Sequence, residues 1–140
     1  EQSHDSGQIL AEQSQRSAKD PGALEALHAI RAGAEQAREA LLGGAPEQLG
    51  EIMQRGWEAK RRLAKGVSNP RIDAAYEAAI SAGASGGKIA GAGGGGFLLV
   101  VCPHERQAAV SAAMEQKGLV RADFHFENAG ARILVNSAAN

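Results

Sequence analysis

The glycine-rich run at residues 91–96 is the segment whose composition most directly suggests chemistry. It consists of Gly91, Ala92, Gly93, Gly94, Gly95 and Gly96. Glycine loses more backbone entropy on folding than any other residue, so such a run needs a structural or functional reason. Successive N–H groups with no Cβ atoms around them can converge on one anion, such as a phosphate group. A tight connection between closely packed strands explains the run equally well, and in either case Gly94 and Gly95 are candidates for positive φ.

Two familiar phosphate motifs do not account for this run. Residues 91–96 contain the spacing G-x-G-x-x-G, but a dinucleotide-binding fold requires a helix after that motif. The apolar residues 97–102 predict a strand there instead. A Walker loop is excluded because Ile89, rather than Ser or Thr, follows Lys88, and because Ala82 stands where the first glycine is needed.

Basic side chains close to the run could supply the positive charge that a phosphate ligand needs. Lys88 precedes the run by three residues, where it could neutralise a phosphate or equally be an exposed strand residue. Residues 55–71 contain one acidic residue, Glu58, and six basic ones: Arg55, Lys60, Arg61, Arg62, Lys65 and Arg71. A solvated helix face explains most of these, although Arg and Lys also match phosphate oxygens. Lys60 is the candidate ligand among them, because it adjoins the apolar face of its helix.

Asn69 and Asp73 are further candidates, as ligands of a substrate hydroxyl. Capping of a helix that starts at Pro70 explains Asn69 as well, and a favourable interaction with the helix dipole explains Asp73.

Trp57 is better explained by packing than by stacking on a sugar. The histidines show no metal-ligand spacing, and no Ser/His/Asp or Cys/His set is indicated. The sequence therefore predicts no catalytic residue and no metal site in this chain.

Composition narrows the classes of function. The 140 residues are 44% hydrophobic and 22% charged, as in soluble globular proteins, and the net charge of −1 gives no general attraction to nucleic acid or membranes. A single cysteine, Cys102, excludes an internal disulfide framework and a multi-cysteine zinc site. No apolar run approaches the ~20 residues of a transmembrane helix, and no secretory signal is recognisable. We expect a cytoplasmic protein without nucleic-acid or membrane partners.

The elements that must position these residues fall into two parts. Residues 1–82 predict helices over 9–18 and 21–42, a third helix that begins at Pro46 and includes Leu63, and a fourth from Pro70 until Gly83. Asp20 and Asn69 before prolines are typical N-caps.

Residues 83–140 form the second part, in which the hydrophobic period changes. We predict strands over residues 88–92 and 97–102, a helix over 103–117, and strands over 120–127 and 131–135. The run at 97–102 is expected to be buried on both faces. The fold class is therefore α+β: helices followed by β-β-α-β-β, with helices packed on one face of a four-stranded, mostly antiparallel sheet.

Several segments of the chain resemble a known protein family. Residues 86–99 look like the C-terminal glycine-rich motif of GHMP kinases, and are most similar to the branch of D-glycero-D-manno-heptose 7-phosphate kinases. Residues 57–60, 68–73 and 124–126 add to the likeness, and residues 6–13 resemble the entry of that branch into its C-terminal domain. The resemblance covers nearly the whole chain and implies a ferredoxin-like C-terminal domain over residues 1–140, the C-terminal part of a longer protein.

The resemblance implies ATP-dependent phosphoryl transfer to a small hydroxylated substrate, here a phosphorylated sugar such as heptose 7-phosphate. It also implies that ATP and Mg²⁺ serve the full-length enzyme and that this chain alone binds neither. The family's ATP phosphate loop and catalytic acidic residue belong to an N-terminal domain, and no segment here matches them. On this interpretation the isolated chain is inactive.

Two other interpretations stay open at the sequence level. One is a non-catalytic α+β module for ligand binding or regulation, and the other is an interaction domain that pairs with a separate kinase chain. The expected partners are thus a sugar phosphate and an N-terminal kinase domain, in the same or a separate chain, with a homodimer as a further option.

Overall fold

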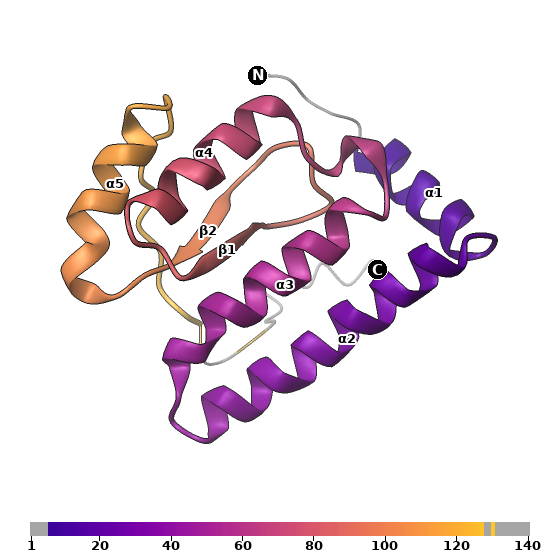
Figure 1. The fold of residues 1–140 in the computed structure, drawn as a ribbon, viewed down its shortest axis with the longest axis horizontal. Helices are drawn as coiled ribbons and strands as arrows, with labels where there is room; N and C mark the ends of the chain where they lie inside the picture. The colour runs from indigo at the N-terminus through magenta and orange to yellow at the C-terminus, as the bar shows by residue number, and fades with distance from the viewer. Residues whose placement is uncertain (1–5, 128–129, 131–140) are drawn as a thin grey trace, which may run out of the picture.

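The computed structural model describes residues 6–127 and 130 as a helical part, a β-hairpin and a last helix (Figure 1). The helices are α1 (Ser6–Ser17), α2 (Pro21–Leu42), α3 (Leu49–Arg61), α4 (Pro70–Ser81) and α5 (Gln107–Glu115). Short 3₁₀ turns precede α3, α4 and α5, at Pro46–Gln48, Lys65–Val67 and His104–Arg106. The strands β1 (Gly86–Ile89) and β2 (Leu98–Val101) pair antiparallel. None of the described helices combines the length and the apolar composition that crossing a membrane requires.

Two helices, α2 and α4, begin where their capping residues predict. Asp20 accepts a hydrogen bond from the N–H of Gly22 at the start of α2, and Asn69 accepts one from Ile72 at the start of α4. The predicted helix 21–42 is confirmed, and α2 ends before Gly43. The predicted third helix is wrong at both ends, because a 3₁₀ turn follows Pro46 and α3 stops at Arg61.

Small residues let α2 and β1 approach α3 from two sides. Ala23 and Ala26 of α2 are buried together with Ala59 and Leu63, so these helices pack closely. On the other side of α3, a Cβ atom on Gly86 of β1 would lie 1.9 Å from the carbonyl oxygen of Gly50, a separation that atoms cannot adopt. In the view of Figure 1, the hairpin consequently runs beside α3, with α4 and α5 on its far side and α2 outside α3.

Two further apolar clusters hold the hairpin in place. One lies near the β1–β2 connection and joins α1, α3 and β1 through Ile9, Trp57, Ala64, Val67 and Ile89. The other lies at the opposite end of the hairpin and joins α4 to α5 through Ala79, Ala84 and Val110. The core is therefore built mainly from aliphatic residues and alanine, with Trp57 its one large aromatic side chain among the described residues.

The structure supports an α+β class and corrects several details of the predicted sheet. β1 spans 86–89 rather than 88–92, because Gly86 and Gly87 pair with Val101 and Val100 before the chain enters the loop. β2 is half-buried instead of buried on both faces, since α3 lies mainly against β1.

The four-stranded sheet is not confirmed, because the described sheet contains two strands. Residues 120–127 form no strand in the structure, and their side chains are exposed. A polar–apolar alternation becomes a strand only when a neighbour accepts its hydrogen bonds. The predicted strand at 131–135 lies outside the described residues, so the full β-β-α-β-β order and the placement of helices on one face stay predictions.

Candidate functional site

The glycine-rich run forms the loop that joins β1 to β2. The N–H of Ala90 donates a hydrogen bond to the carbonyl of Phe97 (2.8 Å), which closes the loop at its base. Inside it, positive φ occurs at Gly91, Gly93, Gly94 and Gly96, with values of 92°, 118°, 76° and 92°. These are backbone conformations that side-chain-bearing residues rarely adopt. The expectation of positive φ therefore holds for Gly94 and fails for Gly95, whose φ lies outside the left-handed region.

The loop is held by the segment that connects α3 to α4. The N–H of Gly94 donates to the carbonyl of Val67 (2.9 Å), and the Asn69 side-chain amide donates to the carbonyl of Gly94 (3.2 Å). Gly93 lies so close to this segment that a Cβ atom on it would be 2.8 Å from the Cα of Val67. The Lys60 ammonium group donates to the carbonyl of Gly91. The connecting segment therefore holds the loop at Gly93 and Gly94, and Lys60 of α3 holds it at Gly91.

Most N–H groups of the loop have no hydrogen-bond acceptor among the described residues. Apart from that of Gly94, they donate no hydrogen bond to any described residue; they belong to Gly91, Ala92, Gly93, Gly95 and Gly96. Gly91 and Gly96 are exposed to solvent, whereas Gly93 and Gly94 are buried against the connecting segment. Clustered backbone donors of this kind suit an anionic oxygen.

The structure brings Lys60 and Lys88 together beside the loop. Burial of the Lys60 ammonium group, and in second place the positive charge of Lys88, hold the pKa of Lys60 below its ordinary value. Lys88 lies on β1 opposite Leu99, before the chain enters the loop. Neither lysine forms an ion pair with a described carboxylate. Two adjacent cations without counter-ions favour an anionic ligand.

Asn69 and Asp73 are placed near the loop, but their polar atoms have partners within the protein. Asn69 caps α4 with its carbonyl oxygen and holds Gly94 with its amide. The Asp73 carboxylate accepts a hydrogen bond from Ser68 (2.6 Å) and pairs with Arg61 (3.1 Å). These contacts position the connecting segment, and substrate contacts by Asn69 and Asp73 stay predictions.

Val67, and the structural role of Ser68, were missed by reasoning from the sequence. Val67 contacts the loop through its backbone carbonyl, which leaves no side-chain signal, and Ser68 belongs to the family-like residues 68–73 but gives no sign there of its hydrogen bond to Asp73. The adjacent pair Asn69-Pro70 was the available signal, because it marks a helix start that fixes the preceding residues. Trp57, in turn, is 1% exposed and packs in the core, in agreement with the packing interpretation.

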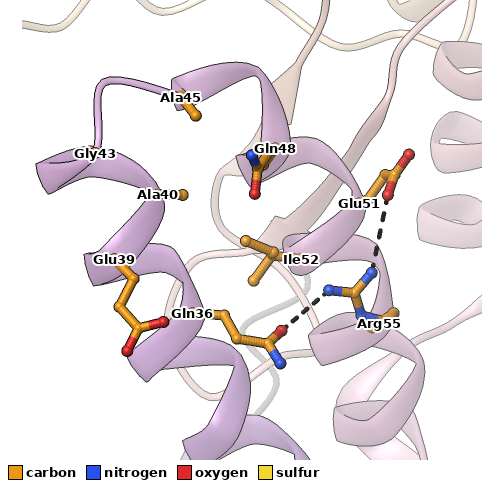
Figure 2. Close-up of a pocket in the computed structure, with 9 residues that line it drawn as sticks. All are labelled: Gln36, Glu39, Ala40, Gly43, Ala45, Gln48, Glu51, Ile52 and Arg55. Atoms are coloured by element: carbon orange, nitrogen blue, oxygen red, sulfur yellow. Dashed lines mark hydrogen bonds and ion pairs between the residues drawn. The ribbon is translucent and has the colours of Figure 1, made fainter.

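A separate pocket of about 630 Å³ lies between the end of α2 and the start of α3 (Figure 2). Arg55 extends across its wall, where it donates to Gln36 (3.1 Å) and approaches Glu51 (4.0 Å). None of the residues predicted to bind substrate lines this pocket. Because Gln36, Glu51 and Arg55 already pair with one another there, this pocket is not the candidate site.

Comparison with known proteins places this chain in a family. The protein-family model described as "GHMP kinases C terminal" matches residues 37–119. A D-glycero-alpha-D-manno-heptose 7-phosphate kinase from Campylobacter jejuni subsp. jejuni serotype O:2 is 35% identical over 114 residues, which are 81% of this chain and 33% of that protein. A bifunctional fucokinase/GDP-fucose pyrophosphorylase from Arabidopsis thaliana is 35% identical over 75 residues, which are 54% of this chain and 7% of that protein.

A solved structure supports the same assignment at the level of the fold. The crystal structure of L. major mevalonate kinase in complex with R-mevalonate matches with a TM-score of 0.71 at 21% identity, over 81% of this chain and 35% of that one. This chain thus spans about a third of the length of the heptose 7-phosphate kinase and of the mevalonate kinase. The family model covers more than half of the chain, and the resemblance carried by residues 86–99 is confirmed. The chain belongs to the GHMP kinase family, of which it contains the C-terminal domain.

Proposed function

We propose that this domain forms the substrate-binding side of an ATP-dependent sugar-phosphate kinase, in which the glycine-rich loop, Lys60 and Lys88 bind the phosphate group that the sugar already carries. The observation that carries the proposal is the pair of lysines without counter-ions beside a loop of free N–H donors. The relative that acts on heptose 7-phosphate supports a phosphorylated heptose as the substrate class.

The loop contributes to such a reaction by fixing the substrate. Phosphoryl transfer depends mainly on positioning and on neutralisation of the phosphate charges. A phosphate held by backbone N–H groups and by Lys60 would place the rest of the sugar at a defined distance from the loop. The contacts from Val67 and Asn69 keep the loop backbone in the conformation that presents those N–H groups.

We propose that this domain holds no Mg²⁺ by itself. No three His, Cys, Asp or Glu side chains in residues 6–127 and 130 lie close enough to share a metal ion, and magnesium in phosphoryl-transfer sites relies on substrate phosphates besides one or two carboxylates. We therefore assign no metal-dependent step to these residues. ATP, its Mg²⁺ and the catalytic acid are proposed to be held by another domain of the kinase, and the isolated domain is proposed to be inactive.

An ADP-release assay on the full-length protein tests this function. We expect release with ATP and a heptose 7-phosphate, and much weaker release with the same sugar lacking its phosphate. The isolated residues 1–140 should release no ADP with either sugar. Failure of every sugar phosphate to support turnover would contradict the proposed activity, and turnover by residues 1–140 alone would contradict the proposed division of labour.

A further inference from the structure

A second basic site lies on the other side of the connecting segment, between the α1–α2 connection and the end of α3. It is a pocket of about 430 Å³. Its charged lining comprises one carboxylate and four cations, namely Asp20, Arg16, Arg61, Arg62 and Lys65. This surplus of positive charge is local, because the whole chain carries a net charge of −1.

Two of the cations are engaged by the protein. Arg16 donates to the Asp20 carboxylate (2.8 Å) and to the backbone carbonyl of Arg62 (2.9 Å). The hydrogen bond from Arg16 is the main reason why the pKa of Asp20 lies below its ordinary value, so this carboxylate is charged and already paired at neutral pH. Arg61 pairs with Asp73. Asp20 and Asp73 are therefore paired with Arg16 and Arg61, and neither carboxylate pairs with Arg62 or Lys65.

Arg62 and Lys65 have no such partner. Neither side chain forms an ion pair or a hydrogen bond with any residue that the structure describes. Glu12 accepts a hydrogen bond from the backbone N–H of Lys65 (3.3 Å) but forms no ion pair with its side chain. A guanidinium and an ammonium group that face one concave surface can together surround the oxygens of a dianion.

This pocket is separate from the glycine-rich loop. No loop residue, nor Lys60 or Lys88, lines it, although Lys60 and Arg61 are neighbours in the sequence. The last turn of α3 directs Lys60 to the loop and Arg61 to the pocket and Asp73. A ligand in the pocket would thus leave the loop free for the substrate.

We propose that this pocket is a second anion site, in which Arg62 and Lys65 bind a phosphate group independently of the sugar-phosphate site. The ligand class is a small phosphate dianion, either inorganic phosphate or the phosphate of a small monoester. This assignment does not depend on the proposed kinase activity, because it uses none of the residues at the loop.

Calorimetric titration of the full-length protein tests the site. Inorganic phosphate and glycerol 3-phosphate are titrated in parallel at constant ionic strength, in a Lys60→Ala background that weakens binding at the loop. The double variant Arg62→Gln/Lys65→Gln should weaken the binding of both probes by about tenfold or more, the size expected for lost charged hydrogen bonds. The probe that binds more tightly identifies free phosphate or a monoester as the source.

A matched control separates a defined site from the general charge of the protein. Arg38 and Lys117 are exposed cations that do not line the pocket, so Arg38→Gln/Lys117→Gln removes the same charge elsewhere. This control should change phosphate affinity by less than about twofold, because distant surface charges are screened. Arg62→Lys, which keeps the charge, should give an intermediate loss and guards against misfolding of the double variant. Equal losses in the pocket and control variants, or no loss in either, would overturn the proposal.

Discussion

Lys60 shows how a single residue connects the sequence to the proposed function. Its spacing from Trp57 predicted a side chain at the margin of the apolar face, and the structure places its ammonium group at the carbonyl of Gly91. The sequence could not predict that Lys88 would lie beside it, because the two lysines come from α3 and β1. Only the packing of that helix on that strand brings them together.

The lowered pKa of Lys60 predicts a pH dependence of substrate capture. If Lys60 binds the substrate phosphate as proposed, it does so in its protonated form, so kcat/KM for the sugar phosphate should fall as the pH rises through the pKa of the free enzyme. This fall should begin at lower pH than for an ordinary lysine, whose value is 10.5, because burial and Lys88 disfavour the charged form. A kcat/KM profile measured up to about pH 10 would show it.

Lys60→Arg supplies the control for this profile. Arginine stays protonated to about pH 12 or above, so the fall in kcat/KM should move out of the measured range. An unchanged alkaline limb in this variant would mean that another group titrates, and the assignment to Lys60 would be wrong.

Within the loop, two positions separated by one residue should respond very differently to substitution. Gly93→Ala places a Cβ atom against the backbone of Val67 at a φ of 118°, so we expect a loss of stability of about 1–3 kcal/mol and a fall in kcat/KM of at least about tenfold. Gly95→Ala should change both little, since Gly95 has no positive φ and has open space around it. Chemical denaturation and steady-state kinetics measure both quantities. Similar behaviour of the two variants would contradict the geometry of the loop.

At the scale of elements, helices were predicted better than strands. Capping residues and prolines are local signals, and they located α2 and α4 correctly from Asp20-Pro21 and Asn69-Pro70. Strand pairing depends instead on residues distant in the sequence. Gly86 and Gly87 have low strand propensity, but they join β1 because a Cβ atom would collide with α3 at Gly86 and with β2 at Gly87. No local sequence pattern predicts these close approaches.

That close approach makes a prediction about two glycines of α3. Gly50→Ala should destabilise the fold by about 1–3 kcal/mol, because its Cβ atom would lie 2.0 Å from the hydroxyl oxygen of Ser85. Gly56→Ala, in the same helix, meets no atom within 4 Å and should stabilise the protein by about 0.5–1 kcal/mol through helix propensity. Urea denaturation measures the free energy of unfolding of both variants. A loss of stability in both would contradict the prediction, because it would mean that general helix effects outweigh the close contact at Gly50.

At the scale of the whole molecule, the order of helices followed by a glycine-linked hairpin was predictable, and the family likeness added what composition could not show. The polar–apolar alternation at 120–127 predicted a strand, but the structure has none there. A strand also requires a neighbouring backbone to pair with, and an alternating pattern of side chains does not predict one. The pocket lined by Arg62 and Lys65 could not be predicted either. The sequence showed a basic segment, but not which of its side chains lie at the pocket and which lie at the loop.

The most direct test of the account compares KM for a heptose 7-phosphate with KM for the unphosphorylated heptose, in the full-length protein and in its Lys60→Ala variant. A contact between Lys60 and the substrate phosphate predicts that KM for the phosphorylated sugar rises by roughly 10- to 100-fold in the variant, while KM for the other sugar hardly changes. Lys117→Ala, which removes an exposed lysine that forms no ion pair with a described residue, should leave both values as they were. An equal rise for both sugars, or no rise for either, would contradict phosphate binding at this loop.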